Sequence, residues 1–116
     1  MTNVPLSGRR KLSKGEVDMI VTAHEKLVTG KPGGRRAVLK FVDLTGFDLS
    51  RRNLADADLS ASILDGAKLI GANLERANLN GAVIRNANLS GANLRGAELI
   101  GADLARALIL VTVPIA

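Results

Sequence analysis

The chain has 116 residues, of which 47% are hydrophobic but only 2% aromatic, and it contains no cysteine and a single histidine. The lack of cysteine excludes disulfides, thiolate nucleophiles and cysteine-bound zinc, and one histidine cannot form a histidine-rich metal site. The formal net charge is +5. The excess comes from residues 1–40, in which nine basic residues stand against three acidic ones.

Residues 1–12 form the first segment and carry three consecutive basic residues at positions 9–11. We expect a flexible basic arm here. No continuous apolar stretch follows it, and no segment approaches the ~20 apolar residues that a membrane span requires. We therefore expect a cytoplasmic protein with no signal peptide and no membrane partner. The arm has no aromatic residue for base stacking, so we do not expect a nucleic-acid interface.

Residues 13–36 are predicted to form a capping helix and a glycine-rich linker. Ser13 and Glu16 have the spacing of a capping box, which places the helix over about residues 14–28, before the stop signal at Gly30. Apolar residues at helical spacing should form one packing face, made of Val17, Ile20, Val21, Leu27 and Val28.

A five-residue repeat occupies residues 37–111, followed by a short tail at 112–116. Leu or Ile stands at every fifth position fifteen times in succession, and alanine stands two residues earlier in eleven of these units. A period of five fits neither a helix nor a strand, so each unit should be a straight piece with both residues inward and a corner, often at glycine, after it. Opposite charges recur twenty residues apart, as in Asp56 and Arg76, which favours four units per coil.

The tandem unit Ala-(Asn/Asp)-Leu-x-x resembles the pentapeptide-repeat family. The resemblance implies an all-β solenoid, a right-handed quadrilateral β-helix with a hydrophobic ladder inside. A solenoid needs a cover on its end coil, and the predicted helix would supply an N-terminal α-helical cap. Val42 and Phe47 replace alanine in the first coil and should pack on that helix. Arg52 at the same position would need a partner, either Glu25 or the carbonyl end of the helix.

No catalytic triad, metal cluster or cofactor motif is visible, and a leucine-filled coil should hold no pocket. His24 is assigned a structural role, because no second histidine or cysteine accompanies it. We expect a non-catalytic protein-interaction or scaffolding module, without cofactor or metal, for a protein partner that the sequence does not identify. The candidate partner contact consists of outward apolar residues that interrupt the polar rows: Ile63, Val83 and Ile70. Strand propensity on an exposed face explains these residues equally well.

The family resemblance also implies an alternative function, a DNA-mimic type of protein that binds DNA gyrase or topoisomerase. Such mimicry needs an acidic surface. Residues 41–116 instead contain seven basic and eight acidic residues, so this remains the alternative.

The polar alternation fails near the C-terminal end of the repeat. An apolar end coil with unpaired backbone groups can pair with a second copy of the chain, so we expect a homodimer through this coil. The candidate dimer interface is Ile100, Leu108, Leu110, Val111, Val113 and Ile115. The alternative is that residues 111–116 fold back over the last coil and leave a monomer.

Overall fold

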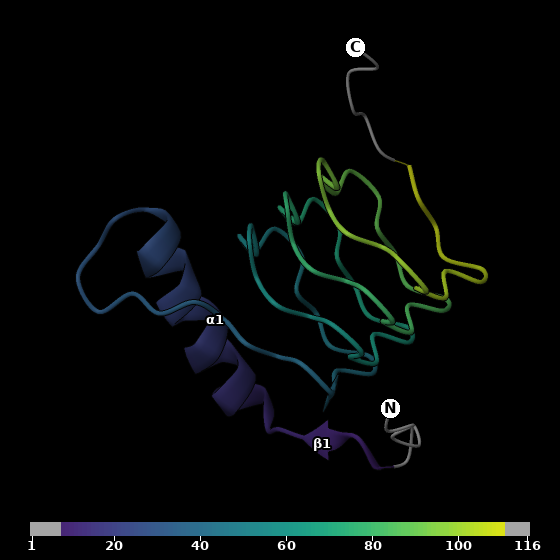
Figure 1. Cartoon of the computed structure of the whole chain (residues 1–116), viewed down its shortest axis with the longest axis horizontal. Helices are drawn as coiled ribbons and strands as arrows, with labels where there is room; N and C mark the ends of the chain where they lie inside the picture. Colours follow the sequence, from purple (N-terminus) through teal and green to yellow (C-terminus); the bar gives the residue numbers. More distant parts are fainter. Residues whose placement is uncertain (1–7, 111–116) are drawn as a thin grey trace.

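A stack of four-sided coils, with one helix lying against its first coil, makes up the computed structural model, which describes residues 8–110 (Figure 1). The elements are a short strand β1 (Arg10–Lys11), the helix α1 (Lys14–Val28) and a short strand β2 (Val42–Asp43). The repeat then winds upward from β2. The C-terminal tail predicted at residues 112–116 lies outside the described residues.

Successive coils are joined by parallel bridges between residues that are twenty positions apart. One column of bridges runs along each of the four sides, for example Asn53 to Asn73 and Asn73 to Asn93. The backbone N–H of Leu59 donates to the carbonyl of Asn78 one coil further on, at 2.8 Å, and the same bond recurs through the stack. The period of twenty predicted from the charges is therefore confirmed.

Outward Asn and Asp residues stabilise many of the corners at which the chain turns. The Oδ1 atom of Asn73 accepts the backbone N–H of Glu75 at 3.0 Å, and nine outward Asn or Asp residues make this bond to the residue two positions on. This is the Asx turn, which short polar side chains favour. The next residue adopts a left-handed conformation, with φ of 56° at Arg76 and 70° at Gly91. Glycine is common there because this conformation carries no steric cost for it.

The core is a column of leucines with alanines beside it, and the inward Leu and Ile residues from Leu39 to Leu89 are buried. The inward residues of the last described coil are only half-buried: Leu94, Leu99 and Leu104. They lose one neighbour because no further coil covers them within residues 8–110. The stack is therefore well packed in its middle and open at its C-terminal end.

The helix α1 begins as predicted, because Ser13 and Glu16 form a complete capping box. Val17 and Val21 are fully buried in the same core as the leucine column, and Ile20 packs against it. Leu27 and Val28, in contrast, are 48% and 40% exposed, so their assignment to the packing face is wrong. The last turn of α1 is approached by the returning chain instead, since Gly34 lies against the backbone of Leu27, too close for any side chain.

Two large residues of the first coil, which we expect to pack on α1, lie in or against the core that includes Val17 and Val21. Val42 is 1% exposed within the core, and Phe47 is partly buried against it. The large residues fit at these alanine positions because α1, rather than another coil, lies on that side (Figure 1).

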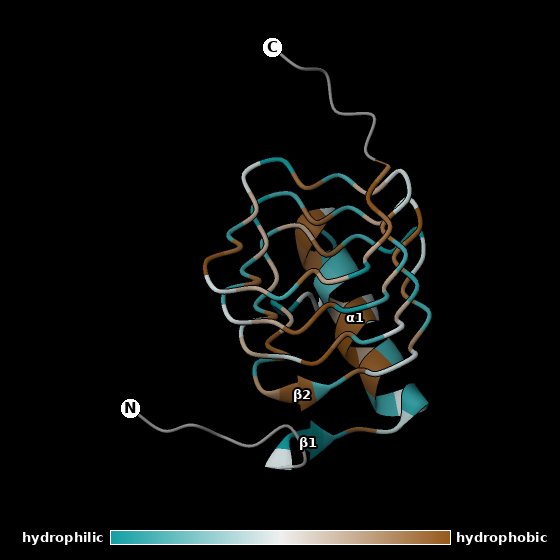
Figure 2. Cartoon of the chain, turned by 90° about the vertical axis from the view of Figure 1, so that its right-hand side faces the viewer, coloured by the Kyte–Doolittle hydropathy of each residue, from teal (hydrophilic) through white to brown (hydrophobic). Residues whose placement is uncertain are grey.

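The basic segment before α1 is not a free arm over its whole length. Arg10 and Lys11 form β1, which pairs in parallel with Val42 and Asp43 of β2, and Figure 2 shows the two strands side by side. The arm boundary predicted at residue 12 is thus wrong for these residues, because backbone pairing adds a partial layer to the first coil. Residues 1–7 lie outside the described part. Within residues 8–110, no helix is long and apolar enough to cross a membrane.

Candidate interaction surfaces

His24 joins α1 to the first coil through both ring nitrogens. Its side chain is buried, the backbone N–H of Ala37 donates to Nδ1 at 2.9 Å, and Nε2 lies 2.6 Å from the carbonyl oxygen of Ala55. Because Nδ1 must accept, the ring proton is assigned to Nε2, which donates to Ala55. The imidazole is therefore neutral and holds two backbone segments of the coil, consistent with a structural role.

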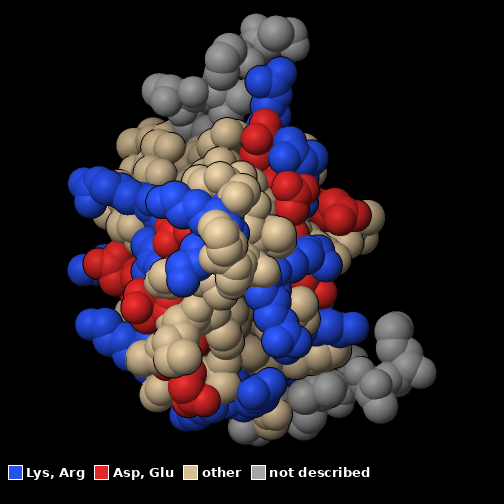
Figure 3. All heavy atoms as spheres, turned by 90° about the vertical axis from the view of Figure 1, so that its left-hand side faces the viewer, with Lys and Arg blue, Asp and Glu red and all other residues tan. Residues whose placement is uncertain are grey.

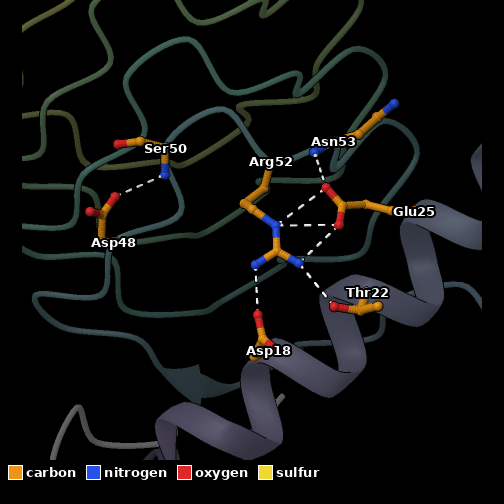
Figure 4. A network of polar contacts seen from close by, with 7 residues as sticks. All are labelled: Asp18, Thr22, Glu25, Asp48, Ser50, Arg52 and Asn53. Carbon is orange, nitrogen blue, oxygen red and sulfur yellow. Dashed lines mark hydrogen bonds and ion pairs between the residues drawn. The ribbon is translucent and has the colours of Figure 1, made fainter.

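Arg52 forms a second link between the coil and α1 (Figure 4). Its guanidinium donates to Asp18 at 2.8 Å, to Glu25 at 2.9 Å and to the Thr22 hydroxyl at 3.1 Å. The second oxygen of Glu25 accepts the backbone N–H of Asn53 at 3.0 Å. The predicted partner Glu25 is confirmed. Asp18 and Thr22 were missed, although they precede Glu25 by seven and three residues and so share its side of the helix.

The Arg52 hydrogen bonds, followed by the Asn53 backbone bond, hold the pKa of Glu25 below its ordinary value. A carboxyl whose pKa is lowered in the folded state stabilises it above the unfolded pKa and loses this contribution as the pH falls through the lowered value. At pH 7, Glu25→Gln should therefore lower the free energy of unfolding by about 1–2 kcal/mol, the range for a partly exposed charged hydrogen bond. Urea unfolding of both proteins should show this difference shrinking below about pH 4.

Glu98→Gln is the matched control, because Glu98 is exposed and makes no ion pair within the described residues. It should change stability by less than about 0.5 kcal/mol at either pH. A pH-independent loss in Glu25→Gln would contradict the assigned role of the Glu25 charge.

Acidic and basic side chains alternate along the outer columns instead of separating by sign. Asp56 and Arg76 pair at 3.0 Å and Asp65 and Arg85 at 2.7 Å, each pair twenty residues apart as predicted. Figure 3, viewed from the side of α1, shows the two signs intermixed. On the face that Figure 3 shows, the acidic residues are therefore not gathered into a patch of their own.

One of the three residues of the candidate partner contact is buried and so cannot belong to it. Ile63 and Val83 do stack, being joined by a parallel bridge. However, Ile63 is only 5% exposed, because Asp43 and Val83 flank it in the column, so its assignment to the surface is wrong. Val83 and Ile70 are half-buried. The contact with a partner stays a prediction for these two residues.

The candidate dimer interface lies at the open end of the stack. Ile100 is 78% exposed, and Leu108, Ile109 and Leu110 are also exposed. The backbone N–H groups of the inward leucines in this coil, Leu94, Leu99 and Leu104, have no backbone partner within residues 8–110, whereas those of the leucines in earlier coils do. Val111, Val113 and Ile115 lie outside the described residues. The described part of the predicted interface is thus apolar and open.

Two grooves border α1, although the sequence led us to expect no pocket. The first, of about 620 Å³, lies between the first turn of α1 and the segment from Thr45 to Leu49, with Arg52 at its side. The second, of about 370 Å³, lies between the opposite flank of α1 and residues 35–38. In the coil itself, the inward Leu and Ile residues from Leu39 to Leu89 are buried. The hollows arise because a round helix lies against a flat-sided coil, which the repeat pattern cannot reveal.

The sequence profile of pentapeptide repeats matches in eight copies, over residues 53–91 and 72–108. A pentapeptide repeat protein, Rfr23, from the cyanobacterium Cyanothece 51142 is 36% identical over 61% of this chain and 49% of its own, with a TM-score of 0.60. A comparison with curated proteins finds no match.

Two further pentapeptide repeat proteins of known structure are similar to the chain. One, from the thylakoid lumen of Arabidopsis thaliana, is 32% identical over 65% of this chain and 56% of its own, with a TM-score of 0.42. The other, from Nostoc Pcc 7120, is 33% identical over 83% of this chain and 78% of its own, with a TM-score of 0.39. The chain spans about half the length of the Cyanothece and Arabidopsis structures. The eight matched repeats and the four-sided stack together show that the chain belongs to the pentapeptide-repeat family of right-handed quadrilateral β-helices.

Proposed function

We propose that this protein is a non-catalytic interaction scaffold that pairs with a second copy through its C-terminal coil. Proteins of this family are generally structural or interaction modules. The observation that carries the proposal is the open end of the stack, where Ile100 is 78% exposed and the apolar rim of Leu108 and Leu110 lies beside unpaired backbone groups. An uncovered strand edge of this kind pairs readily with another chain.

The two ends of the stack differ, and this difference favours a closed dimer over a filament. The helix α1 lies against the first coil, where Val17, Val21 and His24 are buried, so we propose that it acts as a cap. A two-fold contact places the same patch of two copies together and closes without further growth. A head-to-tail contact would need an exposed first coil and would polymerise. With one end capped, end-to-end pairing stops at two copies.

Light scattering after size exclusion at high micromolar concentration tests the dimer. The wild type should have twice the chain mass of 12.1 kDa, and the variant Leu108→Glu/Leu110→Glu should have the single-chain mass, because two buried carboxylates in a symmetric contact repel each other. Folding of the variant is checked by its circular dichroism spectrum.

Met19→Glu/Val38→Glu is the matched control, since it adds the same two charges at exposed apolar positions of the capped end. It should remain a dimer. A wild-type mass of 12.1 kDa at this concentration would refute self-association and favour a C-terminal segment that folds back over the last coil.

A further inference from the structure

The second groove is lined by apolar residues and two arginines. The contacts that His24 and Arg52 make between α1 and the coil do not involve it. Three residues of α1 form one wall, Met19, Ile20 and Ala23, and the chain that enters the first coil forms the other, Arg35, Arg36 and Val38. We call this feature the basic–apolar groove. It lies on the flank of α1 opposite to the Arg52 network and far from the open C-terminal end of the stack (Figure 1).

The apolar residues of the groove are exceptions to the pattern of their own elements. Val38 is 58% exposed, whereas the residues stacked above it on the same side are Asp58, Asn78 and Glu98. Met19 is 73% exposed, more than the other exposed apolar residues of α1, Leu27 and Val28, which are 48% and 40% exposed. The two exceptions line the same hollow, and an exposed apolar patch bordered by polar residues is typical of a contact site for another protein.

The charge of the groove is positive because the neighbouring carboxylates have partners of their own. Arg35 makes no side-chain ion pair among residues 8–110, and the Nε of Arg36 donates to the backbone oxygen of Asp56 at 2.7 Å. The Asp56 carboxylate is held by Arg76 at 3.0 Å, and that of Asp58 accepts from Ser60 at 2.6 Å.

Glu16 lies on the same flank of α1, but its carboxylate is used in the capping box with Ser13. The guanidinium of Arg35 and the two terminal nitrogens of the Arg36 guanidinium are therefore available to a ligand.

We propose that the basic–apolar groove binds a short acidic, amphipathic segment of a partner protein. An apolar side chain of the segment would lie on Met19 and Val38, and its carboxylates would bind Arg35 and Arg36, whose planar guanidinium groups match a carboxylate in two-point fashion. The hollow shape favours a peptide over a lipid surface, because a peptide segment can enter between the two walls and contact both, whereas a flat bilayer would contact only their exposed tops. The inference rests on the proposed interaction function but is independent of self-association.

Selection from a library of random 12-residue peptides displayed on phage tests this inference without a known ligand. The wild-type protein is the bait, and Arg35→Glu/Val38→Asp is used to remove phage that bind elsewhere. Both positions are exposed, so this variant should fold, which its circular dichroism spectrum verifies. We expect enriched peptides with a net negative charge and at least one large apolar residue. A failure to enrich peptides beyond the counter-selection, or enrichment of basic or uncharged ones, would overturn the proposal.

Fluorescence polarisation with an enriched, labelled peptide then locates the site. We expect at least a tenfold rise in Kd for Arg35→Glu and for Met19→Ser, and a weaker affinity at high salt, since exposed charges are screened. The matched controls make the same changes outside the groove, Arg95→Glu for the charge and Val28→Ser for an exposed apolar residue, and they should leave Kd within twofold. Equal losses in the controls would place the site elsewhere.

Two further measurements separate this inference from its alternatives. The variant Leu108→Glu/Leu110→Glu should bind the peptide as the wild type does, whether or not the wild type is a dimer, so failure of self-association and failure of the groove are distinguishable. Sedimentation with vesicles of phosphatidylglycerol and phosphatidylcholine should show no binding that depends on Arg35. Vesicle binding that is lost in Arg35→Glu would identify the groove as a lipid contact and refute the protein segment.

Discussion

Replacement of His24 by leucine should lower the free energy of unfolding by about 2–4 kcal/mol, because it leaves two buried backbone groups without a partner at about 1–3 kcal/mol each. The groups are the N–H of Ala37, which donates to Nδ1, and the carbonyl of Ala55, which accepts from Nε2. Leucine fills a volume similar to that of histidine, so the loss of stability measures the missing hydrogen bonds more than the creation of a cavity. Urea unfolding followed by circular dichroism measures the difference.

The location of the loss can be checked by hydrogen exchange. Amides of α1 and of residues 35–39 should exchange faster in His24→Leu, while those of the middle coils keep their protection, because the contact lies at one end of a stack in which each coil touches only its neighbours. Lys26→Leu is the control, since Lys26 is exposed on the same helix and should change stability by no more than about 0.5 kcal/mol. Unchanged stability in His24→Leu would mean that Ala37 and Ala55 find other partners.

The features that local rules govern could be predicted from the sequence. The capping box placed the start of α1 at Lys14, and the structure has the helix over Lys14–Val28. The separation of twenty between opposite charges gave the number of sides, because residues one coil apart must be neighbours in the bridge columns. The partner of Arg52 could also be predicted, since Glu25 is an acidic residue of the helix that lies against the first coil.

The features that depend on the angle between α1 and the coil could not be predicted. Helical spacing allowed Leu27 and Val28 to join the packing face, but the buried stripe runs through Val17, Val21 and His24 instead. The reason is that the last turn of α1 meets the returning chain at Gly34 rather than the coil. Both grooves follow from the same angle.

The strand β1 was missed for a different reason. Its two residues, Arg10 and Lys11, are exposed and charged, so no pattern of hydrophobicity marks them. The pairing is made by the backbone alone, as when the N–H of Arg10 donates to the carbonyl of Phe41 at 3.0 Å. A backbone hydrogen bond of this kind can form whatever the side chains are. Its position depends on where the chain enters α1.

Truncation of Leu74 to alanine should be the most destabilising of these changes, with a loss of about 3–5 kcal/mol in the free energy of unfolding. Leu74 is fully buried in the middle of the leucine column. Its N–H donates to Asn93 at 2.8 Å, and Leu54 one coil earlier donates in turn to Asn73 at 2.7 Å. These bonds fix the spacing of the coils, so the walls cannot close over the missing side chain and a cavity remains.

Leu104→Ala is the matched comparison, because the same side-chain atoms are removed from the same inward position of the last described coil. Leu104 is only half-buried, so at dilute protein the loss should be about 1–2 kcal/mol, in proportion to the smaller apolar area withdrawn from water. At concentrations at which the end coils pair, a second copy would cover this residue, and the cost should rise with protein concentration by mass action. The cost of Leu74→Ala should not depend on concentration in this way. Equal costs for the two truncations in dilute solution would contradict an open end, since they would require Leu104 to be as deeply buried as Leu74.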